Sequence, residues 1–256
     1  MMLADKQGNT PAIMDEGGLI YVLHEEEAAI RKNNDLKFPL VVRSNIYDCV
    51  DWMLTSEWDD DDFSNFHASK VNTHWHFLQF DNQSSDGVIT GFSNEQSVRP
   101  FTMLEKKTDK GLPLPLNTTF TKAAKKGERV ITVKNAAQYH PEIEILIGAD
   151  NVGGNEVGRI KSIKGNEITL VRPLKNDHPV KDIVTVEFVR QRFWVDSDVG
   201  TVFWHDHALG RITWGHGGFG TMIVEPVGST YHNPKTGAPI RSGPLADIRT
   251  AEPVGY

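Results

Sequence analysis

The sequence predicts an all-β protein, an antiparallel β-sandwich that is interrupted by a small inserted β-module. Most apolar runs are short, rich in Val, Ile and aromatic residues, and bounded by Gly, Asn and Asp, as strands and turns are. The chain has 256 residues, of which 39% are hydrophobic, and this is enough for a sizeable core. No repeat with a period of 20–50 residues is visible.

The N-terminal part of the chain begins with an extension, residues 1–37, in which residues 25–31 are fair helix formers and predict one or two turns. From Phe38, the run FPLVVRSNIYDCVDWMLTS predicts two consecutive strands with a polar break at Ser44 and Asn45. A polar connection follows, and VNTHWHFLQF predicts the next strand.

The segment 116–189 has a different sequence pattern, which predicts the inserted β-module. Its short β-runs are separated by turn residues, and Gly165 and Asn166 suit a tight hairpin. The interrupted domain would then consist of residues 38–115 and 190–227, ending with the glycine-rich strand GGFGTMIVEPV. Residues 228–256 are loop-like and resemble a linker towards a following domain.

Charge and hydropathy exclude several classes of function. The net charge of -7 and the pI near 5.8 argue against a nucleic-acid-binding protein, which would carry clustered Lys and Arg. No window approaches the roughly 18 apolar residues of a membrane helix. The first residues also lack the charged start and apolar middle of a secretion signal.

Cysteine usage limits the metal chemistry that is available. The single cysteine, Cys49, excludes an internal disulfide framework and a thiolate-rich zinc site. It lies in an alternating strand pattern, so we expect a buried, inert thiol. Any metal site must therefore depend on histidines and carboxylates.

Four of the ten histidines form two matching His-X-His pairs, His74 with His76 and His205 with His207. In an extended strand, residues i and i+2 point to the same face, so each pair offers two imidazoles side by side. Imidazole suits copper, zinc, iron and nickel, and an all-imidazole set favours copper or zinc. If the pairs face each other, four nitrogens could bind one metal ion or several.

The runs THWHF and GTVFWHDHALG, with the later GGFGTMIVEP, resemble the first two copper-binding motifs of the multicopper oxidases, a family of laccases, ferroxidases and manganese oxidases. The resemblance covers about residues 39–101 and 190–226, and the first motif region is similar to large bacterial manganese oxidases. It implies a cupredoxin-like Greek-key β-sandwich. It also implies that the chain oxidises a metal ion such as Mn(II), or a phenol, and reduces dioxygen to water.

The same resemblance assigns roles to the four histidines. It implies that His74 binds the type 2 copper of a trinuclear cluster, that His76 binds a type 3 copper, and that His205 and His207 serve the type 3 pair. It further implies export to an extracellular, periplasmic or spore-surface location.

The sequence departs from the family pattern in two ways. The His-X-X-His-X-His and His-Cys-His runs that complete the cluster are missing, and Cys49 lacks flanking histidines. We therefore expect an N-terminal piece that is inactive alone and needs one or more C-terminal cupredoxin domains, from the same polypeptide or a partner subunit. The second departure is the 129-residue separation of His76 and His205, which the inserted module accounts for.

Two other functions remain open. The same histidines could form a zinc or binuclear-metal hydrolase, which would need carboxylates near the pairs, and Asp206 is the one close in sequence. Alternatively, the chain could be a non-catalytic cupredoxin-like domain for assembly or copper storage. Asp206 itself could orient an imidazole, relay protons or face solvent.

The remaining candidates are expected to be structural. His216 lies beside glycines and is interpreted as a loop residue; the alternative is a position near the copper cluster. His140 and His178 lie in polar surroundings and are interpreted as surface residues. The acidic run 57–63 could collect a divalent cation, but a solvated loop is the preferred interpretation.

Overall fold

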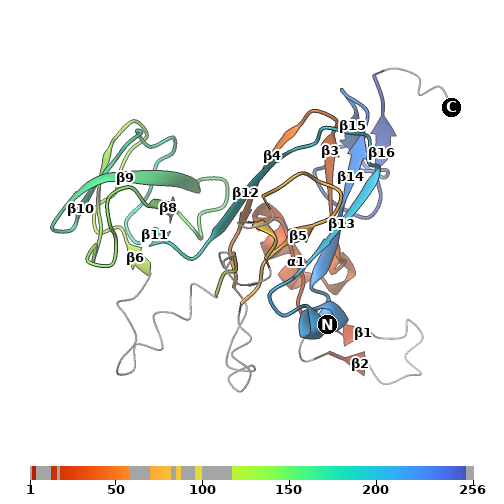
Figure 1. The fold of residues 1–256 in the computed structure, drawn as a ribbon, viewed down its shortest axis with the longest axis horizontal. Helices are drawn as coiled ribbons and strands as arrows, with labels where there is room; N and C mark the ends of the chain where they lie inside the picture. The colour runs from red at the N-terminus through yellow and green to blue at the C-terminus, as the bar shows by residue number, and fades with distance from the viewer. Residues whose placement is uncertain are drawn as a thin grey trace. The chain divides into compact units, whose positions relative to one another are not determined.

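The computed structural model confirms the all-β class, with many strands and a few short helices (Figure 1). It describes residues 2–3, 13–15, 18–57, 70–81, 85–87, 96–99 and 117–251. The chain divides into two compact units, a larger one of residues 1–53, 71–97 and 190–256, and a smaller one of residues 54–70 and 98–189. No helix within the described ranges is long and apolar enough to cross a membrane.

The larger unit is built on a four-stranded sheet in the order β3-β14-β13-β5. A second ladder pairs β12 with β4, and two short ladders pair β1 with β2 and β15 with β16. The strands are β1 (Met2–Leu3), β2 (Ile13–Met14), β3 (Leu40–Asn45), β4 (Cys49–Leu54), β5 (His74–Trp75), β12 (Val189–Trp194), β13 (Thr201–His205), β14 (Phe219–Glu225), β15 (Thr230–His232) and β16 (Asp247–Arg249).

Pairing in the main sheet is not purely antiparallel as expected. β14 is antiparallel to β13, but β3 runs parallel to β14 with Gly220 opposite Leu40. Strand β14 alternates strictly between buried and less buried positions, which gives it one face towards the core. A parallel pair needs a long connection, and alternation in sequence cannot reveal which distant strand is the partner.

Tryptophans form the core behind the main sheet. The ring centroids of Trp75 and Trp204 lie 5.2 Å apart, and Trp52 lies 5.0 Å from Trp75 and 5.4 Å from Trp204. Gly220 is required here, because a Cβ at this position would lie 2.2 Å from the Trp204 ring. The two strands that carry the His-X-His pairs are thus anchored by their own buried aromatic residues.

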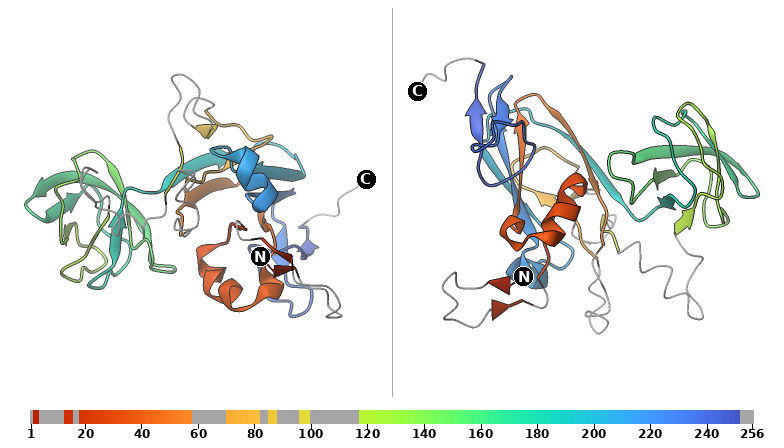
Figure 2. Two further views of the ribbon diagram at one scale, coloured as in Figure 1. Left: turned by 90° about the horizontal axis from the view of Figure 1, so that it is seen from below. Right: turned by 180° about the vertical axis from the view of Figure 1, so that it is seen from behind.

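In the part of the chain that the structure describes, the helices are short (Figure 2). The helix expected at residues 25–31 is confirmed as a 3-10 turn followed by α1. A second short pair follows β13 and leads into β14. The segments are η1 (His24–Glu26), α1 (Glu27–Lys32), η2 (Asn34–Leu36), α3 (Gly210–Thr213) and η4 (Trp214–His216).

The smaller unit is a six-stranded antiparallel sheet in the order β6-β11-β8-β9-β10-β7. A bridge between Phe120 and Val133 joins the first and last strands, so the sheet closes into a small barrel (Figure 1). The expected hairpin at Gly165 and Asn166 is confirmed, with Gly165 at φ +59°. The strands are β6 (Asn117–Thr119), β7 (Val130–Thr132), β8 (Glu144–Ile147), β9 (Glu156–Lys164), β10 (Glu167–Leu170) and β11 (Ile183–Thr185).

The segments expected as an extension and a linker both pack on the larger unit. Tyr21 is buried against Trp204, with ring centroids 4.7 Å apart. Tyr231 donates a hydrogen bond of 2.8 Å to the carbonyl of Ser44. Two burial predictions were wrong: Cys49 is exposed on β4, and His178 is buried in the smaller unit.

His178 is buried because two carboxylates meet its ring. Its Nδ1 lies 2.7 Å from Asp182 Oδ2, and its Nε2 lies 3.1 Å from Glu156 Oε1. The ring also stacks on Phe120. The polar neighbours of His178 in sequence therefore do not indicate exposure, because its second partner lies 22 residues away. His140, in contrast, is exposed as expected.

Candidate metal centre

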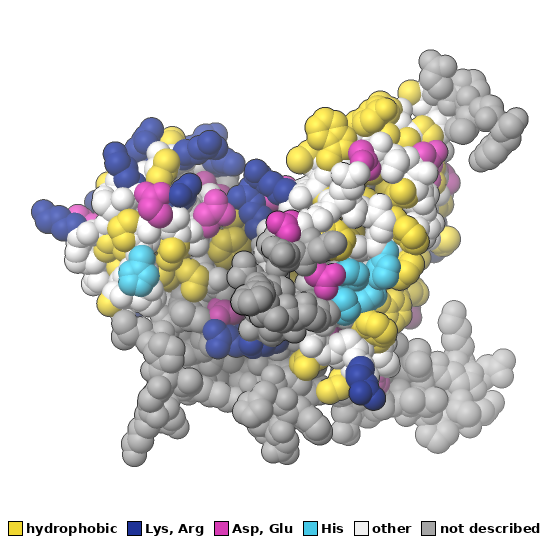
Figure 3. Space-filling model, in the orientation of Figure 1, with side chains coloured by type: hydrophobic (Ala, Val, Ile, Leu, Met, Phe, Trp, Pro, Cys, Tyr) yellow, Lys and Arg dark blue, Asp and Glu magenta, His cyan; other side chains and the backbone are white. Residues whose placement is uncertain are grey.

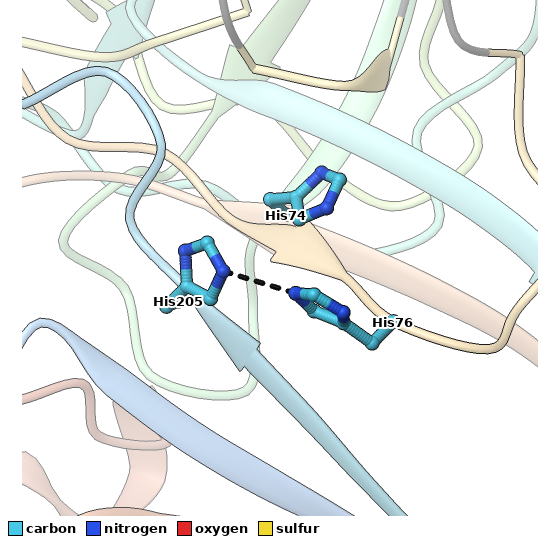
Figure 4. A group of neighbouring side chains, drawn as sticks. All are labelled: His74, His76 and His205. Atoms are coloured by element: carbon cyan, nitrogen blue, oxygen red, sulfur yellow. Dashed lines mark hydrogen bonds between the residues drawn. The ribbon is translucent and has the colours of Figure 1, made fainter. Parts of the chain in front are cut away.

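The two His-X-His pairs come from adjacent antiparallel strands, β5 and β13. Trp75 pairs with Trp204, and His74 pairs with His205. Since cross-strand partners point to the same face of a sheet, the two tryptophans enter the core and the two histidines lie together on the other side. The structure thus brings together histidines that are at least 129 positions apart in the sequence (Figure 4).

All four rings of the pairs lie close together. His76 Nε2 and His205 Nε2 are 3.0 Å apart (Figure 4). The ring centroid of His74 lies 4.8 Å from His76, 5.3 Å from His205 and 4.4 Å from His207. Nitrogen atoms at these spacings can share one ion or serve two neighbouring ions.

The strand expected at VNTHWHFLQF is much shorter than predicted. β5 contains His74 and Trp75, and Phe77 has a left-handed backbone with φ +61°. β13 ends at His205. The second histidine of each pair therefore lies just past a strand, and turns rather than strand alternation place it beside the first.

Asp206 fixes the turn after β13. Its carboxylate is fully buried and accepts hydrogen bonds from the N–H groups of Asn72 and Leu209, both at 3.0 Å, and from the Thr213 hydroxyl at 2.6 Å. The expectation that it could face solvent is wrong. Its backbone carbonyl accepts from the indole N–H of Trp214, whose ring packs against His205.

Three of the four rings direct Nδ1 at a backbone carbonyl. His74 Nδ1 lies 2.9 Å and His207 Nδ1 3.2 Å from the carbonyl oxygen of Asp86, and His205 Nδ1 lies 2.9 Å from that of Asp206. A carbonyl only accepts hydrogen bonds, so Nδ1 carries the proton and Nε2 keeps its lone pair. Metal-binding histidines are held in this way in proteins.

Asn72 connects the two histidine motifs with the loop that carries Asp86. Its side-chain amide donates to the Gly87 carbonyl and accepts from the backbone N–H of His207, both at 2.8 Å. Gly87 has φ +90°, and a Cβ there would lie 2.7 Å from the Asn72 amide nitrogen. Only a glycine lets the loop approach so closely.

Burial keeps the histidines in the form that binds metals. Desolvation lowers the pKa of His74, and the neighbouring His207 adds to this effect. Desolvation likewise lowers the pKa of His76 and of His205. Near neutral pH these three imidazoles are therefore neutral, as a metal ligand must be.

Aromatic side chains surround the histidines. Phe203 stacks on His76 with ring centroids 4.0 Å apart, and Phe77 packs on the edge of Phe203. Phe203, Phe77 and Trp214 are all more than one-third exposed. In the space-filling view the histidines gather on one face beside hydrophobic side chains (Figure 3).

Two overlapping groups that include residues of the His-X-His pairs could hold a metal ion. One consists of His74, His76 and His205, and the other of His74, His207 and Asp86. In each group, one donor atom per residue lies within 4.8 Å of the others. Asp86 was not predicted from the sequence. The one available signal was its place before a glycine, ten positions after His76.

The other candidate residues lie apart from these groups. His216 is in η4, and its Nδ1 lies 2.7 Å from Asp15 Oδ1. Residues 58–63 of the acidic run lie outside the described part of the chain.

Comparison with known proteins gives little further information. No family model matches the chain, and no curated protein matches it. A solved structure with some similarity is the Gp54 tailspike of Acinetobacter baumannii bacteriophage AP22 in complex with A. baumannii capsular saccharide. The match covers 29% of this chain and 14% of the tailspike chain, with 16% identity and a TM-score of 0.25. A similarity of this size carries no argument about function.

Proposed function

We propose that this chain is the N-terminal part of a multicopper oxidase. In this proposal His74, His76, His205 and His207 supply half of the ligands of a trinuclear copper cluster. The whole protein would reduce dioxygen to water while it oxidises a metal ion such as Mn(II) or a phenol. The observation that carries the proposal is the convergence of four imidazoles from β5, β13 and the turns after them.

The donor set fits copper. Imidazole nitrogen is a favourable ligand for copper, and copper(II) prefers bond angles near 90°. Two nitrogens that each lie about 2.0 to 2.1 Å from one ion at a right angle are about 2.9 Å apart. His76 Nε2 and His205 Nε2 lie 3.0 Å apart, so their spacing is compatible with a shared ion.

Copper, when bound, supplies the one-electron redox steps that dioxygen reduction needs. The residues of this chain would hold the copper and orient the histidine rings that bind it. The Asp86 carbonyl accepts from Nδ1 of His74 and of His207, so that the Nε2 of each ring keeps its lone pair for a metal ion. The Asp206 carboxylate fixes the turn between His205 and His207. Because these acceptors are already in place in the folded chain, little reorganisation would accompany copper uptake.

We further propose that the larger unit has a cupredoxin-like Greek-key arrangement. The parallel pairing of β3 with β14 and the separate β12-β4 ladder support two packed sheets around the tryptophan core. The remaining copper ligands, including the type 1 site, would come from one or more C-terminal cupredoxin domains of the same polypeptide or from a partner subunit.

The test uses the chain together with the polypeptide that follows it in its native gene. After loading with copper, the protein should bind several copper ions, show a near-ultraviolet band from a bridged copper pair, and consume oxygen with Mn(II) or a phenol. His76→Ala and His205→Ala should abolish oxygen consumption. His140→Ala, which changes an exposed histidine of the smaller unit, should leave it unchanged.

Two results would overturn the proposal. Stoichiometric zinc with hydrolytic turnover would favour a hydrolase. Oxygen consumption that survives both histidine substitutions would place the copper cluster elsewhere and leave this chain as a non-catalytic domain.

A further inference from the structure

Asp86 places a carboxylate between two of the histidines. His74 Nδ1 lies 3.4 Å from Asp86 Oδ1, and His207 Nδ1 lies 3.3 Å from Asp86 Oδ2. The ring centroids of the two histidines are 4.4 Å apart. One donor atom of each of the three side chains lies within 4.8 Å of the others, and each carboxylate oxygen faces a different ring.

These spacings match a tetrahedral metal site. Ligand atoms that lie about 2.0 to 2.1 Å from one ion at tetrahedral angles are about 3.3 to 3.4 Å apart. Each nitrogen-to-oxygen distance, to a different oxygen of the Asp86 carboxylate, has this length, which is longer than an ordinary hydrogen bond. His76 Nε2 and His205 Nε2, at 3.0 Å, are closer than this geometry requires.

We propose that this chain by itself binds one divalent ion of the zinc type through His74 Nδ1, His207 Nδ1 and the carboxylate of Asp86. The site has two histidines and one carboxylate and leaves a coordination position for water. It goes beyond the copper cluster, because Asp86 is a ligand and no other domain contributes.

Charge favours this group over the all-imidazole group. A divalent ion bound by neutral imidazoles alone keeps its full charge, whereas the Asp86 carboxylate neutralises half of it. Zinc sites with two histidines and one carboxylate are stable and keep a fourth position open. The side chains of His207 and Asp86 are 29% and 28% exposed, so water can reach that position, whereas the His74 side chain is 13% exposed.

The Asp86 loop is fixed before any ion arrives. Asn72 holds the Gly87 carbonyl on one side and the His207 backbone on the other. The two segments that carry the ligands therefore already lie beside each other, and binding costs little backbone ordering entropy. Zinc binding breaks the hydrogen bonds that His74 Nδ1 and His207 Nδ1 make with the Asp86 carbonyl. What changes is the tautomer: the proton of His74 and of His207 moves to Nε2, and each Nδ1 turns its lone pair to the ion.

The experiment is a calorimetric titration of the full chain with zinc ions. The wild type should bind one zinc ion per chain. Asp86→Asn and His207→Ala should each weaken binding at least tenfold, since each removes a ligand. His76→Ala should stay within threefold of the wild type. Asp198→Asn is the matched control, because it removes an exposed carboxylate at the opposite end of β13 from His205.

X-ray absorption at the zinc edge gives a second readout. The bound ion should show two imidazoles and additional oxygen ligands, and one imidazole should disappear in His207→Ala. If Asp86→Asn fails to fold, the zinc affinities of His207→Ala and His76→Ala still test which histidines bind the ion.

The proposal is overturned if His76→Ala weakens zinc binding as much as His207→Ala does, or if a folded Asp86→Asn binds like the wild type. Its failure is distinguishable from failure of the oxidase proposal. Zinc binding is measured on the chain alone, whereas oxygen consumption needs the remaining domains and should be lost in His76→Ala.

Discussion

Asn72 offers the sharpest test of how the site is assembled. The side chain is fully buried, and its amide satisfies the Gly87 carbonyl and the His207 N–H. Asn72→Ala removes both partners at once. A buried polar group that loses its partner costs about 1 to 3 kcal/mol, so the two together give about 2 to 6 kcal/mol. This is a large part of the roughly 5 to 15 kcal/mol that stabilises a typical domain.

The assay is urea denaturation followed by tryptophan fluorescence, since Trp75 and Trp204 lie in the core next to the site. Asn34→Ala, at an exposed position of η2, should stay within about 0.5 kcal/mol of the wild type. Zinc affinity should fall about 10- to 100-fold in Asn72→Ala, as it does when residues that support metal ligands are removed. A loss of stability below about 0.5 kcal/mol, with unchanged zinc affinity, would refute the assigned role.

Two further predictions concern the smaller unit and pH. His178→Leu removes the ring that contacts two buried carboxylates, which keep donors from Lys175, Asn176 and Asn151, and should destabilise the protein by about 1 to 3 kcal/mol in urea denaturation. His140→Leu should be neutral, and equal effects of the two substitutions would contradict the buried network. Because the pKa values of His74, His76 and His205 are lowered in the folded chain, the unfolded chain binds more protons than the folded chain below about pH 6.5. Metal-free stability should therefore fall as pH drops through this range, and a slope unchanged by His205→Asn would rule out this histidine as a contributor.

Local sequence patterns were sufficient for the class of fold and for the histidine pairs. Short β-branched runs with turn residues between them predict strands, because a pleated, half-buried surface selects those side chains. The adjacent residues Gly165 and Asn166 predict the hairpin between β9 and β10, because the turn needs a residue that accepts a positive φ. Both signals depend on neighbours within a few positions.

Features that depend on distant partners were not predictable. Asp86 reaches the site because the Gly87 carbonyl meets Asn72, fifteen residues earlier. His178 is buried because Glu156, at the start of β9, contacts its ring. The parallel partner of β3 lies near the other end of the chain. In each case the neighbouring residues in the sequence do not identify the distant partner, so a single sequence cannot predict the contact.

His74 has a part in both proposed metal sites, and the position of one proton separates them. A neutral imidazole carries a single N–H. With the proton on Nδ1, the Asp86 carbonyl accepts it and Nε2 is free on the side of His76 and His205. With the proton on Nε2, Nδ1 is free for Asp86 and His207. Ligands added on the Nε2 side by another domain would therefore draw His74 away from the carboxylate, and zinc held by the isolated chain should be displaced when the copper cluster assembles.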